Sequence, residues 1–209
     1  MKQISLLIKP ASSLCNLRCR YCFYSDVRHN RNEESTGIMS EEVMHALIDR
    51  TMETDAEQIN YCFQGGEPCM AGIGYFHKFI AYVSKTNNGK KVTYAIQTNG
   101  TLIDQNWVKL FRENHFLVGI SIDGFIRNHD YFRKDADGKG TWKKILYNIR
   151  MLNNADISYN ILTVLTHELS SKPAELFQFI LKNQFEYVQL IPCLPSLKGD
   201  EPTDRFALK

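Results

Sequence analysis

Strand-like and helix-like segments alternate along most of the chain, and this order narrows the possible folds more than any other feature. Apolar residues recur at every second position, or form a short continuous run, in segments bounded by turn-forming residues. These expected strands are residues 4–9, 58–63, 92–96, 116–122, 157–165 and 187–191. Apolar residues at helical spacing follow each of the first five segments. The order predicts right-handed crossover units and a parallel sheet.

The starts of several expected helices carry recognisable residues. Ser40 and Asp104 precede helical patterns and are suited to accept hydrogen bonds from the first free backbone N–H groups. Thr141 precedes another helical pattern, and Pro173 suits the first turn of a helix. These signals place the helix boundaries independently of the apolar spacing.

The number of strands decides between known α/β architectures. Six strands are too few for a closed barrel of eight, so we expect a partial (β/α)6 barrel of parallel strands with outer helices. A doubly wound sheet is the alternative. The 209 residues suffice for one domain with its own core. We expect this domain to cover residues 1–195 and residues 196–209 to form a polar C-terminal tail.

Composition and charge exclude several classes of partner. The chain is 44% hydrophobic and 23% charged, with a net charge of +2 and both signs interspersed. It therefore shows no basic face for nucleic acid. No apolar run approaches the roughly 18 residues needed to span a bilayer, and no signal segment opens the chain. We expect a cytoplasmic protein that binds neither nucleic acid nor a membrane.

The stretch ASSLCNLRCRYCFY, residues 11–24, places Cys15, Cys19 and Cys22 in a C-x3-C-x2-C run. A disulfide pair is disfavoured, because the chain shows no sign of secretion. A structural zinc ion normally takes four ligands, and only a remote residue such as Cys62, Cys69 or His29 could supply the fourth. A [4Fe-4S] cluster held by three cysteines leaves one iron for a substrate.

Other unusual segments follow the expected strands at their carboxyl ends, where parallel α/β folds build their sites. They are the Gln-Gly-Gly-Glu turn at 64–67, the polar segment 97–99, Ser121 with Asp123, and Cys193 with Leu194. The glycines let a backbone approach a ligand closely, and a carboxylate such as Glu67 suits an ammonium group. We expect these segments to converge with the cysteines on one cleft.

The cysteine run, with Tyr21 before its third cysteine, resembles the cluster motif of radical S-adenosylmethionine (SAM) enzymes, and the Gly-Gly-Glu-Pro segment matches their second motif. The resemblance extends to one family. SLLIKPASS, CNLRCRYCFY, FQGGEP, QTNGTLID, FLVGIS and RKD are similar to segments of anaerobic sulfatase-maturating enzymes. These enzymes oxidise a cysteine or serine of a sulfatase peptide to formylglycine, and they take electrons from reduced flavodoxin or ferredoxin.

The resemblance implies a role for particular residues. Cys15, Cys19 and Cys22 would ligate a [4Fe-4S] cluster, and the amino and carboxylate groups of SAM would take the fourth iron. The remaining contacts to SAM would come from Tyr21 and Leu194 at the adenine, from Gly66 and Glu67 at the methionine ammonium, and from Ser121 and Arg133 at the ribose and carboxylate end. One electron from the cluster would then cleave SAM to a 5′-deoxyadenosyl radical, which abstracts a substrate hydrogen.

The chain also departs from the family. The resemblance covers the N-terminal radical SAM core, while the family's C-terminal region, with two auxiliary clusters and a catalytic aspartate, has no counterpart here. We therefore assign no catalytic residue. Phe125 stands where the family usually has proline. Another peptide-modifying radical SAM enzyme, or a zinc-stabilised binding module without catalysis, remains as an alternative function.

The remaining reactive residues have simpler interpretations. Cys62 and Cys69 are expected to pack in the core, since a buried free cysteine behaves as a small apolar residue. The histidines show no zinc-type pairing. The run of mixed charge at residues 127–139 is interpreted as a solvated loop, apart from Arg133.

Overall fold

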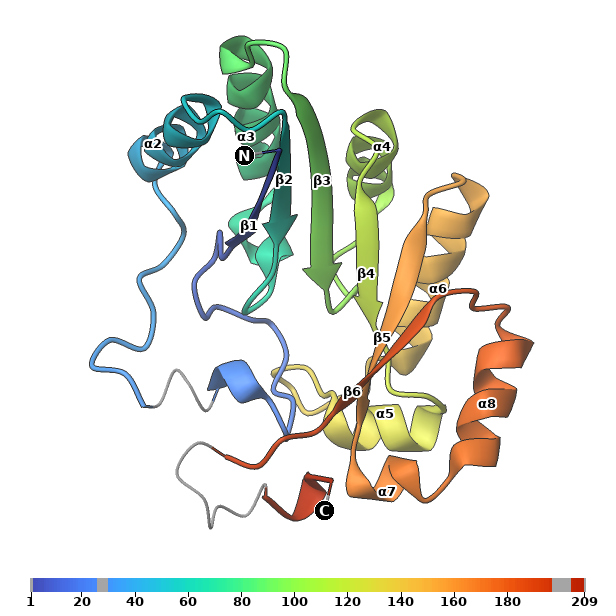
Figure 1. Cartoon of the computed structure of the whole chain (residues 1–209). Coiled ribbons are helices and arrows are strands. Elements are labelled where there is room, and N and C mark those ends of the chain that lie inside the picture. Colours follow the sequence, from blue (N-terminus) through green and yellow to red (C-terminus); the bar gives the residue numbers. More distant parts are fainter. Residues whose placement is uncertain (1, 26–29, 197–203, 209) are drawn as a thin grey trace.

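The computed structural model describes residues 2–25, 30–196 and 204–208 (Figure 1). Its sheet has six strands in the order β1-β2-β3-β4-β5-β6, and every neighbouring pair is parallel. The strands are β1 (Gln3–Ile8), β2 (Gln58–Phe63), β3 (Lys91–Thr98), β4 (Leu117–Ser121), β5 (Tyr159–Leu165) and β6 (Val188–Pro192). A doubly wound sheet reverses its strand order at a switch point, whereas this order never reverses. The expected partial (β/α)6 barrel is confirmed.

The helices lie along the outer side of the curled sheet (Figure 1). The longer ones are α2 (Glu41–Met52), α3 (Ile73–Thr86), α4 (Gln105–Glu113), α6 (Trp142–Asn154) and α8 (Pro173–Lys182). The shorter ones are η1 (Pro68–Ala71), α5 (Ile126–Phe132), α7 (His167–Ser170) and η2 (Asp204–Phe206). Among the described residues, no helix has the length and apolar character to cross a membrane.

Two of the predicted helix starts, Ser40 and Asp104, are confirmed by hydrogen bonds, whereas Thr141 precedes α6 without a side-chain cap. The side chain of Ser40 accepts from the backbone N–H of Val43, and that of Asp104 accepts from two N–H groups of the first turn of α4. Pro173 occupies the first turn of α8, where its missing N–H has no intrahelical partner to lose. A cap of this kind stabilises a helix by about 1 kcal/mol.

The core lies between the outer face of the sheet and the helices. Tyr61 and Phe63 of β2 alternate with half-buried residues, as the sequence predicted, and both are at most 1% exposed. Phe63 packs edge-on against Phe76 and Phe79 of α3, with ring centroids 4.9 and 5.0 Å apart. Burying each such ring stabilises the fold by about 1.5–3 kcal/mol. This packing fixes the strands whose carboxyl ends carry the candidate site.

The inner face of the half-barrel is different in character. Asn60 of β2 joins Ser5 and Thr93 of the neighbouring strands through side-chain hydrogen bonds of 2.8 and 2.6 Å. Cys62, expected in the core, instead lies half-buried on this face and lines a cavity of about 180 Å³ with Gln97 and other residues. Side chains of a strand alternate between faces, so Cys62 points away from the core residues on either side of it.

The prediction of a solvated loop at residues 127–139 is wrong for the first half of that segment. Residues Ile126–Phe132 form α5, and His129, Phe132 and Arg133 are at most 6% exposed. A seven-residue helix with several charges has too short a pattern to reveal its buried face, so tertiary packing decides its structure. Phe125, which stands where the family usually has proline, precedes α5 with φ −72°. Proline also adopts this value, so the backbone here is compatible with either residue.

The end of the chain returns to the domain. Phe206 is 3% exposed and packs edge-on against Phe132, with ring centroids 5.0 Å apart. The backbone N–H of Leu208 donates to the carbonyl of Cys193 at 3.1 Å. Within the segment expected as a polar tail, the described residues 204–208 therefore add a buried aromatic side chain to a second, smaller core cluster.

Candidate functional site

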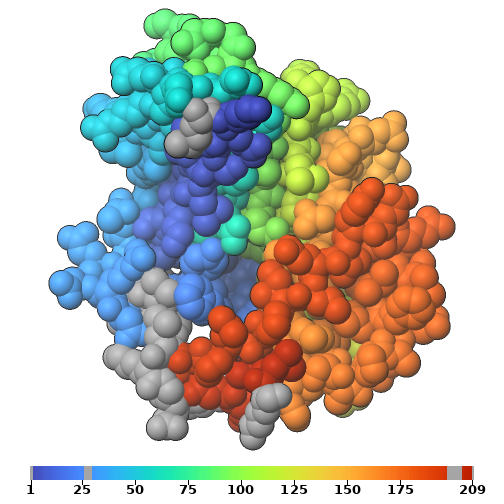
Figure 2. Space-filling view, viewed as in Figure 1, coloured from blue at the N-terminus to red at the C-terminus, as the bar shows by residue number. Residues whose placement is uncertain are grey.

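The cysteine loop follows β1 and lies between two other loops. On one side, the backbone N–H of Glu67, from the loop after β2, donates to the carbonyl of Leu14 at 2.7 Å. On the other side, the N–H groups of Arg18 and Arg20 donate to the carbonyls of Lys134 and Phe132, at 2.7 and 3.0 Å. The surface is hollowed between the blue N-terminal segments and the red C-terminal segments (Figure 2). The predicted convergence of these loops at the carboxyl ends of the strands is confirmed.

Gly66 lies where the two loops touch. Its φ is +58°, a left-handed conformation that residues other than glycine adopt at a cost of about 1–2 kcal/mol. A Cβ atom built on Gly66 would lie 2.5 Å from the carbonyl oxygen of Leu14 and 2.9 Å from that of Ser12. Both atoms belong to the backbone of the cysteine loop, so a side chain here would push that loop away.

The carboxylate of Glu67, which the sequence analysis assigned to the SAM ammonium, faces into the protein and is fully buried. Oε1 accepts from the backbone N–H of Cys69 at 3.0 Å and from the hydroxyl of Thr98 at 2.7 Å, and Oε2 accepts from the backbone N–H of Asn99 at 2.7 Å. Burial raises its pKa, while these hydrogen bonds act to lower it. The side chain holds the loops after β2 and β3 together.

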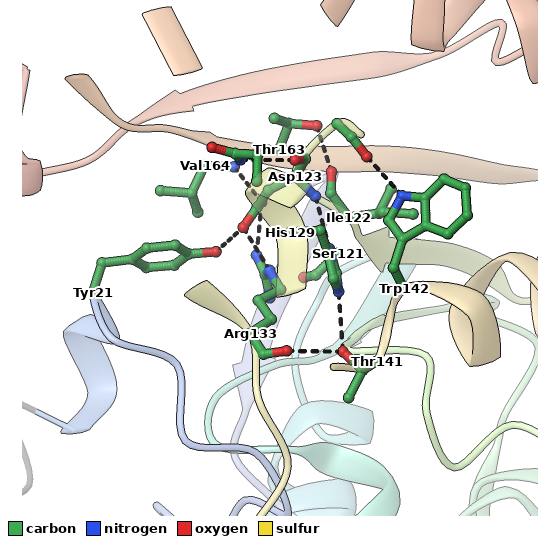
Figure 3. A network of polar contacts seen from close by, with 12 residues as sticks. Tyr21, Ser121, Ile122, Asp123, His129, Arg133, Thr141, Trp142, Thr163 and Val164 are labelled. Carbon is green, nitrogen blue, oxygen red and sulfur yellow. Dashed lines mark hydrogen bonds and ion pairs between the residues drawn. The ribbon is translucent and has the colours of Figure 1, made fainter. Parts of the chain in front are cut away.

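Asp123, after β4, anchors the cysteine loop through the side chain of Tyr21 (Figure 3). Its carboxylate accepts hydrogen bonds from the hydroxyl of Tyr21 and from the Nε and Nη2 atoms of Arg133, the latter two at 2.9 and 3.2 Å. It also accepts from the backbone N–H of Val164 on β5 at 3.0 Å. Tyr21 lies between two of the candidate ligands in sequence, so this network fixes the position of the loop that carries them.

The buried charges of this network compensate each other. Burial acts to raise the pKa of Asp123, but the Arg133 guanidinium outweighs it and holds the pKa below its usual value. Burial acts to lower the pKa of Arg133, yet Asp123 keeps that pKa well above its usual value. His129 accepts from the backbone N–H of Asp123 at 3.1 Å, and burial lowers its pKa to about 3. The site therefore holds a neutral histidine beside a buried ion pair.

The candidate ligand thiols are half-buried. Burial raises the pKa of Cys15 to about 11 and that of Cys19 to about 12, although the positive charge of Arg133 acts against the rise at Cys19. The Cys15 sulfur accepts from the backbone N–H of Leu17 at 3.4 Å and from the amide Nδ2 of Asn99 at 3.8 Å. Deprotonated, these thiols would need a compensating positive charge, which a metal centre provides.

The donor set fits an iron-sulfur cluster. Three thiols on one loop, with N–H donors at one sulfur, are the ligand type of such clusters. Each thiolate of a [4Fe-4S] cluster binds a different iron, so its ligands are spread more widely than those of one ion. No three His, Cys, Asp or Glu side chains of the described residues are close enough to hold a single metal ion. His29, considered as a remote zinc ligand, lies outside the described residues.

The other predicted site residues lie at the same end of the sheet. Ser121, 8% exposed at the end of β4, accepts a hydrogen bond from Gln97 at 3.2 Å. Leu194, just after β6, is 68% exposed. Cys69 is buried, with its sulfur 3.7 Å from the hydroxyl of Thr98, as expected for a packing residue.

Sequence reasoning placed Asn99 and Asp123 among the segments expected at the site, with Asn99 as a side chain that could help to position SAM or the peptide. It assigned no specific contact to Asp123 and overlooked His129, although each of the three has a central position. Asp123 precedes a glycine, which is typical of a turn, and its partner Tyr21 is 102 positions away. Asn99 stands in a polar strand end beside Gln97, which looked equally suited to backbone hydrogen bonding. Asn99 and Asp123 follow expected strands directly, where parallel α/β folds build their sites, whereas His129 stands within the segment predicted as a loop.

Known relatives match all or most of this chain, while the chain spans about half the length of each relative. It is 43% identical over 209 residues to a cysteine-type anaerobic sulfatase-maturating enzyme of Clostridium novyi, covering 100% of this chain and 56% of the relative. It is 31% identical over 192 residues to a serine-type anaerobic sulfatase-maturating enzyme of Bacteroides thetaiotaomicron, covering 91% of this chain and 46% of the relative.

Solved structures agree with the sequence relatives. The structure described as native anSMEcpe with bound AdoMet and Kp18Cys peptide matches with a TM-score of 0.93 and 37% identity, covering 99% of this chain and 56% of that chain. Streptococcus suis SuiB bound to S-adenosylmethionine matches with a TM-score of 0.69 at 16% identity, which shows the fold alone. The sequence also matches the Radical SAM superfamily over residues 10–180. This match covers most of the chain, and the protein therefore belongs to the radical SAM superfamily.

Proposed function

We propose that the chain binds a [4Fe-4S] cluster through Cys15, Cys19 and Cys22 and binds SAM beside it. The observation that carries the proposal is the support of the cysteine loop, which Gly66 and Asp123 contact from opposite sides. A loop fixed in this way presents its thiols at one place without reorganisation on metal binding. Residues 1–195 would form the radical SAM core that performs this binding.

The chemistry belongs to the cofactors. When bound and reduced, the cluster supplies one electron that cleaves SAM into methionine and a 5′-deoxyadenosyl radical, which abstracts a hydrogen atom from the substrate. The chain's own residues position SAM and keep water away from the radical. His129 is neutral, and the charges of Asp123 and Arg133 compensate each other, so this buried network adds no uncompensated charge next to the site.

The methionine end of SAM would lie over the loops after β2 and β4. Since the Glu67 carboxylate is engaged inside the protein, the ammonium group would meet the backbone of Gly66 and Glu67. Ser121 would contribute its hydroxyl to the ribose. Arg133 would attract the carboxylate end through a positive charge that Asp123 holds in place.

The adenine would lie between the cysteine loop and the segment after β6. The side chain of Tyr21 is held by Asp123 and packs against Phe132, with ring centroids 5.3 Å apart. Tyr21 would therefore contact the adenine through its backbone. Leu194, with its exposed apolar side chain, would pack on the adenine ring.

The proposed substrate is a sulfatase polypeptide, whose active-site cysteine or serine would be oxidised to formylglycine. Relatives named for each type of substrate residue, and a related structure with a bound peptide, support this substrate class. Reduced flavodoxin or ferredoxin would supply the electron, and the reducing cytoplasm would keep the thiols available. The chain spans about 56% of the length of the cysteine-type relative. We therefore propose, for this chain, the complete oxidation of the sulfatase cysteine or serine to formylglycine.

The first test is anaerobic reconstitution of the whole chain with iron and sulfide, followed by reduction in the presence of SAM. We expect 5′-deoxyadenosine as the product, and we expect it to disappear in Cys15→Ala. Cys62→Ala is the matched control, because it removes a half-buried thiol outside the cysteine loop. A chain that binds zinc and no iron contradicts the proposal.

A second assay addresses the substrate. A sulfatase peptide is incubated with the reconstituted chain, and formylglycine is measured by mass spectrometry. Production of 5′-deoxyadenosine without formylglycine would support the proposed cleavage of SAM. It would contradict the proposal that this chain alone matures a sulfatase.

A further inference from the structure

Two N–H groups point at the sulfur of Cys15. One is the backbone N–H of Leu17, 3.4 Å away within the same loop. The other is Nδ2 of Asn99, which lies 3.8 Å away and comes from the loop after β3, 84 positions later in the sequence. A side chain from a different loop therefore reaches a proposed cluster ligand.

The amide of Asn99 is fixed in orientation. Its Oδ1 accepts from the backbone N–H of Thr101 at 2.9 Å and from the Thr101 hydroxyl at 2.7 Å, so this atom is identified as the oxygen. The opposite atom is then the NH₂ group, which donates to Oδ1 of Asn16 at 2.9 Å as well as to Cys15. The side chain has no alternative orientation that keeps these bonds.

The backbone of Asn99 is held as firmly. Its N–H donates to Oε2 of the buried Glu67 at 2.7 Å, and the residue is 7% exposed. Glu67 in turn donates its own backbone N–H to Leu14, next to Cys15. The position of Asn99 relative to the Cys15 sulfur is therefore set by three loops at once and is not a chance contact of a mobile side chain.

We propose that Asn99 raises the reduction potential of the cluster by donating an N–H···S hydrogen bond to Cys15. Reduction adds negative charge that the ligand sulfurs share, so a donor at the sulfur stabilises the reduced state more than the oxidised state. Asn99 is a positioning residue that acts through Cys15 and does not touch iron. The inference rests on the cluster proposed for the three cysteines, but on neither SAM cleavage nor the substrate.

The test uses the whole chain reconstituted with iron and sulfide, without SAM. Iron and sulfide content is measured first, and the midpoint potential is then determined by a redox titration followed by electron paramagnetic resonance. Asn99→Ala removes the donor. Asn99→Asp keeps an oxygen for Thr101 and replaces the donor by an acceptor, so it serves where the alanine variant does not fold.

Both variants are expected to have a more negative midpoint. At the potential where half of the wild-type cluster is reduced, the ratio of reduced to oxidised cluster should fall about tenfold, which corresponds to about 59 mV for one electron. Thr98→Val is the matched control, because it removes a hydrogen bond to the same Glu67 and leaves the Asn99 side chain in place. Its midpoint should equal that of the wild type.

Two outcomes overturn the inference alone. One is a fully loaded Asn99 variant whose midpoint equals that of the wild type. The other is a Thr98→Val midpoint shifted as far as that of Asn99→Ala, which would point to general loosening of the loops. A wild-type chain that takes up no iron refutes the proposed function itself, and the iron analysis distinguishes this case.

Discussion

The hydroxyl of Tyr21 donates a hydrogen bond to the carboxylate of Asp123, which joins the cysteine loop after β1 to the end of β4. The same carboxylate holds Arg133, which lies over the Tyr21 ring at 5.5 Å from its centroid. A single buried acid thus connects the N-terminal loop, α5 and the middle of the sheet. The stability of the loop and that of the domain should respond to the same substitutions.

Asp123→Asn should be strongly destabilising. Removing the charge leaves the Arg133 guanidinium buried without its partner, and breaking a buried pair in this way costs about 3–5 kcal/mol of the free energy of unfolding. Urea unfolding followed by circular dichroism measures the change. Glu113→Gln, which breaks the exposed pair with Lys109, is the control and should change stability by less than about 1 kcal/mol. Equal effects of the two variants would contradict the role given to Asp123.

Gly66→Ala should weaken iron binding. The new Cβ would overlap the carbonyl oxygens of Ser12 and Leu14, so the cysteine loop has to move. Gly89 also has a positive φ, but a Cβ atom there meets nothing within 4 Å, so Gly89→Ala reports the backbone cost alone. We expect iron content after reconstitution to fall in Gly66→Ala and to be unchanged in Gly89→Ala. Full iron content in both variants would show that the contact is dispensable.

Stability should fall in mild acid because of His129. Its pKa is about 3 in the folded protein and about 6.5 in an unfolded chain, so below pH 6.5 the unfolded state binds a proton that the folded state excludes. The contribution of the neutral His129 to the free energy of unfolding is complete above pH 6.5. It is lost as the pH falls toward 3, with a slope of up to about 1.4 kcal/mol per pH unit.

His129→Asn isolates this contribution, since its side-chain oxygen can accept from the backbone N–H of Asp123 but does not titrate. Urea midpoints measured between pH 7 and pH 5 should decline less steeply in the variant than in the wild type. Parallel declines would mean that other groups cause the acid sensitivity.

Phe206→Ala should release the end of the chain without unfolding the domain. Phe206 packs on Phe132 in the smaller core cluster, so its loss removes the main apolar contact of the described segment 204–208. We expect faster limited proteolysis at the C-terminal end and a modest loss of stability, about 1.5–3 kcal/mol. Tyr147→Ala, which removes a 63% exposed aromatic ring on α6, should leave the cleavage rate unchanged.

Much of the fold was predictable because it depends on local periodicity. In β2, alternation identified Tyr61 and Phe63 as core residues, and the structure confirms both. Ser40 and Asp104 cap the helices as their types indicate. The bounds differ by only a few residues; for example, the expected strand 157–165 is observed as Tyr159–Leu165.

The site was predictable to a lesser degree. The spacing of the three cysteines and the position of Gly66 after a strand were visible in the sequence. Both are local features, since the cysteines share one short loop and Gly66 lies only a few residues beyond its strand. The direction of the Glu67 side chain was not visible, since it depends on Thr98 and Asn99 of another loop. The same holds for α5, whose short charged segment becomes a helix against Phe206 and the cysteine loop.

The order of residues was enough to predict the alternation of strands and helices, the parallel sheet and the cluster-type spacing of Cys15, Cys19 and Cys22. Asp123 and Asn99 reach the cysteine loop from 102 and 84 positions away, and these contacts arise from the packing of the folded chain. The physical reason is that local spacing reports which face of an element is buried. Which residues meet across loops depends on how the whole sheet curls and packs.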